Sequence, residues 1–294
     1  MNRTALFLII LLSGIFCADV SGLYAQAGAD SLQAEWDNIM RLRFYMNHVF
    51  LENWTQGGDE VFNWRADIEN TFTRESETTS WDNLVKIRYA QNNVGSGSDI
   101  ERRITENQID MRSDIILKRT GTVNPFLGGT LKTQITRGYK YEKDKPREAR
   151  SDFWDPVTLT QNFGMDISGI KYTKVRLSVD YQEKIAETYY GFYKIDDPST
   201  EKIEKHEITK GTTLWCQYRQ QIGEKYSVYA ELESRYNFMH YSEITVNLES
   251  TLDFAIVSFL NFSIQSFFRY DKSQSATRQL RNIAGLTFIF DLFQ

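Results

Sequence analysis

The chain has 294 residues, a formal net charge of −5, 14% aromatic residues and a mean hydropathy of −0.46. The mild negative charge gives no basis for nucleic-acid binding, which needs a basic surface. After residue 27, no apolar run approaches the roughly 20 residues of a membrane-spanning helix, which excludes a helical membrane protein.

The N-terminus predicts a cleaved secretory signal peptide over residues 1–27. Arg3 supplies a short positive region, Ala5–Cys17 is an apolar run, and Ala25–Ala27 has the small-residue pattern of a cleavage site. A helical membrane anchor is one alternative, but the run is short for it. A lipid-modified cysteine is another, and the bulky Phe16 before the cysteine argues against it.

Cleavage would leave Cys216 as the single cysteine of the mature chain. An internal disulfide and a cysteine-based metal site are then excluded, and three scattered histidines make a poor metal site. We therefore expect no metal and no cofactor. The predicted organisation is a short periplasmic segment at 28–40 followed by a β-barrel over 41–294.

Apolar and polar residues alternate along most of the mature chain. Near the C-terminus, Val246 and Leu248 share one phase, whereas Asn247 and Glu249 share the other. This period of two indicates β-strands, because helical spacing would return apolar residues every three or four positions. Twelve segments show it: 41–52, 61–74, 79–92, 103–119, 124–139, 156–169, 172–189, 206–221, 224–238, 243–257, 260–271 and 281–293.

These segments predict an all-β fold, an antiparallel up-and-down transmembrane barrel of about twelve strands. Each segment exceeds the 9–11 residues with which a tilted strand crosses a bilayer. Strands in lipid must close into a barrel, because an open edge would leave backbone groups unpaired. The predicted location is the outer membrane of a Gram-negative bacterium. A soluble β-sandwich or lipocalin-like barrel is the alternative, although such long strands are unusual there.

The links between segments alternate in length, as they do in bacterial barrels. Four short links are Thr120–Val123, Ile170–Lys171, Ile222–Gly223 and Ser258–Phe259. Three long, polar links are Asn93–Arg102, Lys140–Asp155 and Tyr190–Lys205. The pattern places both termini in the periplasm. The loop after the ninth segment is short and the one after the second is not tight, so ten or fourteen strands stay open.

The phase opposite the apolar one carries nearly balanced charge. A selective pore usually has a ring of one sign, so a balanced set favours an ion-paired, largely filled lumen. A narrow, weakly selective conduit is the alternative. The predicted lumen network contains Arg65, Asp67, Glu69, Arg88, Asp110, Arg112, Asp114, Arg176, Asp180, Glu231, Glu233, Arg235, Glu249, Asp253 and Arg269.

Three patches resemble an uncharacterised family of Bacteroidetes outer-membrane barrels, known as a domain of unknown function. They are Asn53–Gly58 followed by Trp64, then Leu131–Tyr139, then Ser151–Pro156 running into Leu159–Gly164. The charged insert Tyr141–Arg150 and the terminal Gln294 depart from the expected pattern. The resemblance implies a fold and a location, and it implies no activity.

The first patch contains a hairpin signature made of Asn53, Trp54, Gly57 and Gly58. The glycine pair supplies the positive φ angles of a tight turn, and the tryptophan suits an interface. We interpret the signature as a turn in preference to a binding site. The aromatic residues within strands are interpreted as interfacial girdles, among them Tyr45, Trp81, Tyr89, Trp215, Tyr218 and Phe267.

No catalytic residues can be assigned. The imidazole bases are His48, His206 and His240, and none lies in a pattern with a nucleophile and an orienting group. An outer-membrane hydrolase is therefore the least favoured hypothesis. We expect a non-enzymatic barrel that is structural, adhesive or accessory to an envelope complex, with partner contacts in loops 140–155 and 190–205. A passive channel for small polar solutes is the rival.

Overall fold

A computed structural model describes residues 36–49, 60–95, 100–118, 121–141, 146–193, 195–196, 201–239, 244–272 and 277–293. The predicted signal peptide and the hairpin signature lie outside these residues. The part from Trp36 onward forms one compact unit. The described residues contain no helix that is long and apolar enough to cross a membrane.

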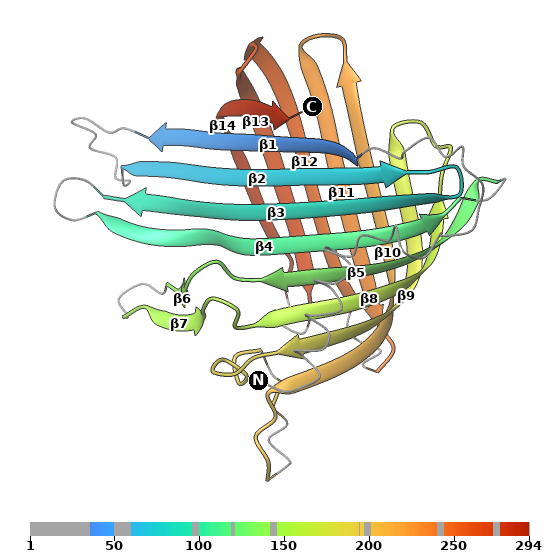
Figure 1. The fold of residues 1–294 in the computed structure, drawn as a ribbon. Helices are drawn as coiled ribbons and strands as arrows, with labels where there is room; N and C mark the ends of the chain where they lie inside the picture. The colour runs from blue at the N-terminus through green and yellow to red at the C-terminus, as the bar shows by residue number, and fades with distance from the viewer. Residues whose placement is uncertain are drawn as a thin grey trace. The chain divides into compact units, whose positions relative to one another are not determined.

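Twelve antiparallel strands form a closed barrel (Figure 1). They are β1 (Trp36–Val49), β2 (Val61–Glu75), β3 (Thr79–Val94), β4 (Glu101–Leu117), β5 (Val123–Thr133), β8 (Val157–Ile167), β9 (Thr173–Ile185), β10 (His206–Ile222), β11 (Tyr226–Asn237), β12 (Ile244–Val257), β13 (Leu260–Asp271) and β14 (Gln279–Phe293). Each strand pairs with the next one along the barrel, and β14 closes the ring on β1. The predicted all-β up-and-down barrel of twelve strands is confirmed.

The fifth predicted segment, 124–139, is wrong in its second half. β5 ends at Thr133, and a separate two-stranded sheet follows from β6 (Gly138–Lys140) and β7 (Glu148–Ser151). The side-chain oxygen of Asn107 on the neighbouring strand β4 accepts the backbone N–H groups of Ile135 and Thr136, each at 2.9 Å. These N–H groups are therefore lost to the barrel ladder.

Two other boundaries also differ. The first strand starts at Trp36, five residues before the predicted segment, and β9 ends at Ile185 although the prediction continued to residue 189. Beyond β9 the chain turns away, and the Thr188 N–H donates to the Asp155 carboxylate at 2.8 Å. As at the end of β5, a side chain accepts backbone N–H groups just beyond the strand, although alternation alone would extend the strand.

The barrel has one end with short links and one end with long links. At the first, which we call the turn end, lie the links 76–78, 118–122, 168–172, 223–225 and 258–259. At the second, the loop end, β1, β3, β5, β9, β11 and β13 finish. The link after β2 is a tight turn, in which Ser76 N–H donates to the Thr79 carbonyl at 2.8 Å. β1 begins and β14 finishes at the turn end.

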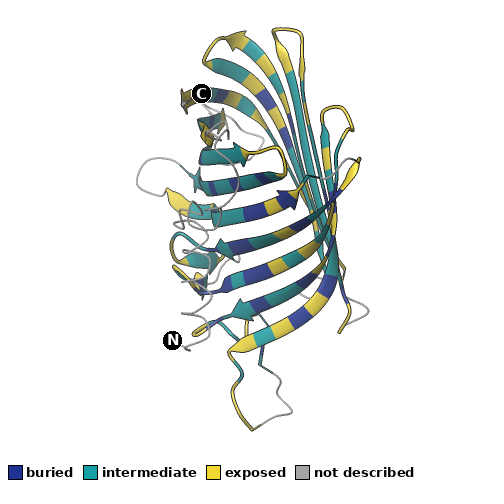
Figure 2. Ribbon diagram, turned by 45° about the vertical axis from the view of Figure 1, so that its right-hand side comes forward, coloured by how far each residue is buried: buried dark blue, intermediate teal, exposed yellow. Residues whose placement is uncertain are grey.

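The two faces of the barrel reverse the polarity of a soluble protein. Large apolar side chains on the outside are exposed, for example Leu127 at 60% and Phe163 at 59%. Charged side chains inside are buried, for example Arg65 at 3% and Asp114 at 2%. Figure 2 shows buried and exposed positions alternating along the strands. The packed interior is therefore polar.

Candidate functional site

The site is the lumen, where strand register brings charged side chains to one face. Asp67 lies opposite Arg43 on β1 and opposite Arg88 on β3. Residues directly opposite in antiparallel strands point to the same face of the sheet. Every second position of adjacent strands therefore points into the enclosed space, where opposite charges can meet.

A cage of three carboxylates surrounds Arg176 near the turn end. Its guanidinium lies 2.9 Å from Asp82 and 2.9 Å from Asp166, and it also contacts Asp114. These acids come from β3, β8 and β4, and all four side chains are largely buried. Gly128 on β5 makes room for the cage, because a Cβ at this position would overlap the Asp114 carboxylate.

Some ion pairs join opposite walls of the barrel. Lys86 Nζ on β3 lies 3.1 Å from Glu231 on β11, and these strands are six apart in either direction around the ring. Arg219 on β10 and Glu69 on β2 are likewise six strands apart, with a nitrogen–oxygen distance of 3.0 Å. Glu69 also pairs with Arg43 at 3.4 Å. These side chains meet across the full width of the lumen.

Glu231 is held by neutral groups as well as by its cation. Its carboxylate accepts hydrogen bonds from the Tyr229 hydroxyl at 2.6 Å and from the Gln217 amide at 3.2 Å. Lys86 in turn donates to the same tyrosine oxygen at 3.2 Å. A buried ion pair needs such additional hydrogen bonds to offset its desolvation.

A second cluster surrounds the buried Arg65. Its guanidinium forms two hydrogen bonds of 2.6 Å with Asp67, lies 3.0 Å from Glu106, and donates to Gln265 at 3.2 Å. The same group also lies over the rings of Tyr45 and Phe267. Arginine suits this position because its planar fork can bind carboxylates and stack on rings at the same time.

The rest of the predicted network is distributed among smaller pairs. Arg88 lies 2.8 Å from Glu249, and Arg235 lies 2.7 Å from Asp180. Glu233 pairs with Lys132 at 2.8 Å and with Arg112 at 3.6 Å. The structure therefore brings twelve of the fifteen predicted residues into ion pairs.

The other three predicted residues bind neutral partners. Asp110 accepts hydrogen bonds from the Gln108 amide at 2.8 and 2.9 Å, and Asp253 accepts from Ser227 and Ser263. Arg269 donates to the Asn247 side chain at 3.1 Å.

The girdle interpretation is wrong for three of the strand aromatics. Tyr45, Trp215 and Phe267 are in the lumen, where arginines lie over their rings. Arg65 is 5.1 Å from the ring centre of Tyr45 and 5.0 Å from that of Phe267, and Arg112 is 4.5 Å from that of Trp215. These residues share the sequence phase of the lumen charges, which was the signal that could have placed them.

Other lumen residues were missed in the same way. Asp82, Glu106 and Arg281 belong to the network, since Arg281 contacts Glu106 and Asp82 belongs to the Arg176 cage. Asp82 shares the phase of Lys86 on its strand, and Arg281 opposes the apolar phase of β14. The alternation rule could therefore have found them.

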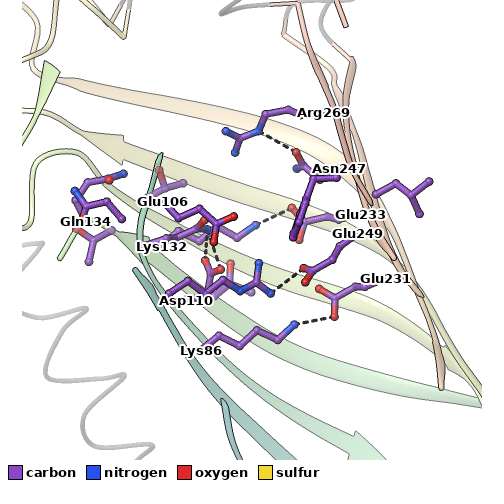
Figure 3. A pocket seen from close by; sticks show the side chains of 18 of the residues that line it. Lys86, Glu106, Asp110, Lys132, Gln134, Glu231, Glu233, Asn247, Glu249 and Arg269 are labelled. Atoms are coloured by element: carbon purple, nitrogen blue, oxygen red, sulfur yellow. Dashed lines mark hydrogen bonds and ion pairs between the residues drawn. The ribbon is translucent and has the colours of Figure 1, made fainter. Parts of the chain in front are cut away.

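A cavity of about 570 Å³ occupies the loop-end half of the lumen. Its deep part is lined by the pairs of Lys86, Arg88 and Lys132 with glutamates, and its upper part by residues such as Arg269 and Tyr193. Figure 3 shows Lys86 and Lys132 reaching across to Glu231 and Glu233, with Arg269 beside Asn247. Two smaller cavities, of about 50 and 20 Å³, lie among the Arg176 and Arg43 side chains.

The loop before β8 contains an aromatic turn. Asp152 and Asp155 exchange backbone hydrogen bonds of 2.8 and 3.0 Å, which places Phe153 and Trp154 at the tip. Trp154 has a φ of 62°, in the left-handed region that L-residues rarely adopt. A hydrogen bond from Arg137 lowers the pKa of the Asp152 carboxyl, helped by the Phe153 N–H.

The histidines remain scattered. His48 lies 3.3 Å from Glu60 and packs edge-on against Phe62, and His206 pairs with Glu183. His240 lies outside the described residues. Within the described ranges no three histidine, cysteine or acidic side chains are grouped as a metal site. The hairpin signature Asn53, Trp54, Gly57 and Gly58 also lies outside them.

Comparisons with known proteins give a family match over part of the chain. A family described as "Protein of unknown function (DUF3078)" matches residues 46–139. This range holds two of the three patches noted in the sequence, and the third lies beyond it. No protein with a curated description matches the chain.

Among solved structures, the chain is similar to the translocator domain of the autotransporter NalP from Neisseria meningitidis. The identity is 10%, the coverage is 95% of this chain and 94% of that one, and the TM-score is 0.41. It is also similar to an outer-membrane channel from Pseudomonas putida F1, with 9% identity, 90% and 100% coverage and a TM-score of 0.42. Both TM-scores are low, and the barrel is established by its own strand pairing.

Proposed function

We propose that the protein is an outer-membrane β-barrel with a closed lumen, and that it serves as a structural, adhesive or accessory component of the envelope. The proposal includes cleavage of the signal peptide and an origin in the Bacteroidetes, which the sequence patches imply. It assigns no catalytic role to any residue.

Membrane insertion is supported by the polarity of the two faces. The outward side chains are apolar and exposed on strands all around the barrel, among them Leu127 on β5, Leu177 on β9, Leu252 on β12 and Leu286 on β14. A water-soluble monomer rarely exposes so much contiguous apolar surface. Lipid is the solvent in which this surface is stable.

The observation that carries the closed lumen is contact between opposite walls. Lys86 with Glu231 and Arg219 with Glu69 join strands at the greatest possible separation around the ring. An open channel would hold water between these walls. The Arg176 cage fills a further part of the turn-end half, beside a cavity of about 50 Å³.

A partner would bind at the loop end. Loops 140–155 and 190–205 were predicted for this role, and the first presents Phe153, which is 61% exposed. Aromatic side chains are enriched at the centres of protein interfaces. An adhesive or accessory role therefore has an exposed surface available to it.

Single-channel recording tests the proposal. Protein extracted from outer-membrane fractions of the producing cells and added to planar lipid bilayers should insert without steady conductance steps. A general porin recorded under the same conditions is the positive control for insertion, and heat-modifiable gel migration checks that the sample is folded.

Two results would contradict it. Steady unitary steps would favour the passive channel, and recovery of the processed chain from the periplasm as a detergent-free monomer would reject the membrane location.

A further inference from the structure

The loop-end cavity has an excess of positive charge. Among its described lining residues, seven side chains are cationic and five are anionic. The whole chain has a net charge of −5, so the cavity differs in sign from the protein around it. An enclosed site of one sign concentrates solutes of the opposite sign.

The deep charges of the cavity are already matched. Lys86 pairs with Glu231, Arg88 with Glu249, and Lys132 with Glu233, at distances of 2.8 to 3.1 Å. Glu106 is paired with Arg65 and Arg281, so four of the five anionic side chains already have a cationic partner, and Asp110 accepts two hydrogen bonds from Gln108. The unmatched positive charge lies nearer the opening.

Arg269 and Arg281 are the cations of that upper part. Arg269 on β13 lies opposite Gln279 on β14, and Phe267 lies opposite Arg281. Both arginines therefore point inward from adjacent strands, two positions apart along the strand ladder. Arg281 stacks on Phe267 at 4.5 Å and contacts Glu106. Among the described residues Arg269 has no carboxylate partner, and its Nε–H donates to Asn247. Its two terminal nitrogens point to no protein acceptor in the described part of the chain.

Neutral donors complete the wall. Gln134, Asn247 and Gln279 supply amide groups, and Tyr193 reaches the cavity from the β9–β10 loop. Burial and Asp155 raise the pKa of Tyr193 to about 12, against the lowering effect of the nearby Arg269 and Arg150. The phenol therefore stays a hydrogen-bond donor at neutral pH.

We propose that the loop-end cavity binds a small polyanion whose charge lies on carboxylate or phosphate oxygens, with Arg269 and Arg281 as its anchors. The guanidinium fork matches such oxygens in pairs. The amides and Tyr193 bind the uncharged part. The volume of about 570 Å³ is that of a small-molecule site. This inference rests on the proposed function, because a closed lumen makes the cavity a binding site that is open at the loop end and closed toward the turn end.

Calorimetric titration of the folded full-length protein in detergent micelles tests the site, with citrate and inorganic phosphate as probes. Saturable binding of either is expected, and the stronger one identifies the oxygen chemistry. R269Q should weaken binding about tenfold or more, since a charge-assisted hydrogen bond contributes that much. The R269K variant keeps the charge but loses the planar guanidinium, so its affinity should lie between those of the parent and R269Q. K171Q loses the same charge in the β8–β9 turn at the far end and should bind as the parent does.

Three outcomes overturn the site: no saturable binding of either probe, equal weakening by R269Q and K171Q, or binding of spermidine in place of the anions. These outcomes are separable from failure of the proposed function. A silent bilayer with no binding rejects the site alone, whereas steady conductance with anion binding rejects the closed lumen alone.

Discussion

The two halves of the lumen contain the same residue types but differ in how completely they are filled. In the turn-end half, Arg176 is enclosed by three carboxylates and the remaining cavities measure about 50 and 20 Å³. In the loop-end half, a cavity of about 570 Å³ remains, and among the residues that the structure describes Arg269 has only a neutral partner.

The difference shows that a balance of charges does not by itself determine how completely a lumen is filled. At the turn end, several strands supply arginines and carboxylates at one level of the barrel, and these side chains fill the lumen. At the loop end, the arginines have fewer partners, and the side chains line a cavity. Buried pairs at the turn end must be satisfied by protein, because little room is left for water. Charges at the loop end keep access to solvent, and therefore to a ligand.

The largest effect is expected from removing the centre of the filled half. Arg176→Ala would leave Asp114 and Asp166 buried without their cation, which typically costs about 3–5 kcal/mol in the free energy of unfolding. Urea unfolding of the barrel in lipid vesicles measures it. The neighbouring Lys174→Ala is the matched control, since this exposed lysine lies 3.5 Å from Asp82 and should cost less than about 1 kcal/mol.

Equal losses of unfolding free energy from the two variants would mean that the cage does not stabilise the fold. The filled half of the lumen would then contribute no extra stability.

An intermediate effect is expected when two ion pairs that line the loop-end cavity and differ in exposure are compared. In double-mutant cycles, Lys86 with Glu231 should show a coupling energy of about 1–3 kcal/mol, because their side chains are only 6% and 18% exposed. The side chains of Lys132 and Glu233 are 36% and 24% exposed. Their coupling energy should be about 1 kcal/mol or less, because water screens the charges. Stronger coupling in the second pair would mean that exposure to the cavity does not weaken an ion pair.

The smallest effect belongs to the loop above the cavity. The pKa of Asp152 is lowered by Arg137, so the stability from this pair is complete above the ordinary aspartate pKa of about 3.9 and is lost as the pH falls through the lower folded value. Tryptophan fluorescence should therefore be constant from pH 5 to 8 and change only in stronger acid, through Trp154. Asp152→Asn should lack this acid transition, and a transition above pH 5 in the parent would contradict the assignment.

Much of the fold and of the charged lumen could be predicted from alternation. The phase that marks Leu248 as outward marks Glu249 as inward, and the structure places both accordingly. The phase also placed Phe267 and Trp215 inside, but their aromatic character was given more weight than their position. Their inward rings are explained by the arginines stacked on them.

Strand ends were less predictable because they depend on distant acceptors. Alternation continues past Thr133, yet Asn107 on β4 takes the next backbone N–H groups and starts a separate hairpin. Nothing in the sequence near residue 135 indicates that acceptor. Loop conformation therefore requires knowledge of which side chains the neighbouring strand brings to the strand end.

The sequence by itself determined the period, a strand number of about twelve and the face on which most of the charges lie, because in a β-strand every second side chain points the same way. Only the tertiary structure decided which charges meet. Lys86 and Glu231 are 145 residues apart and come into contact because the ring places β3 opposite β11. Partner choice depends on closure and on height along the barrel axis, and these are properties of the whole ring that no single strand contains.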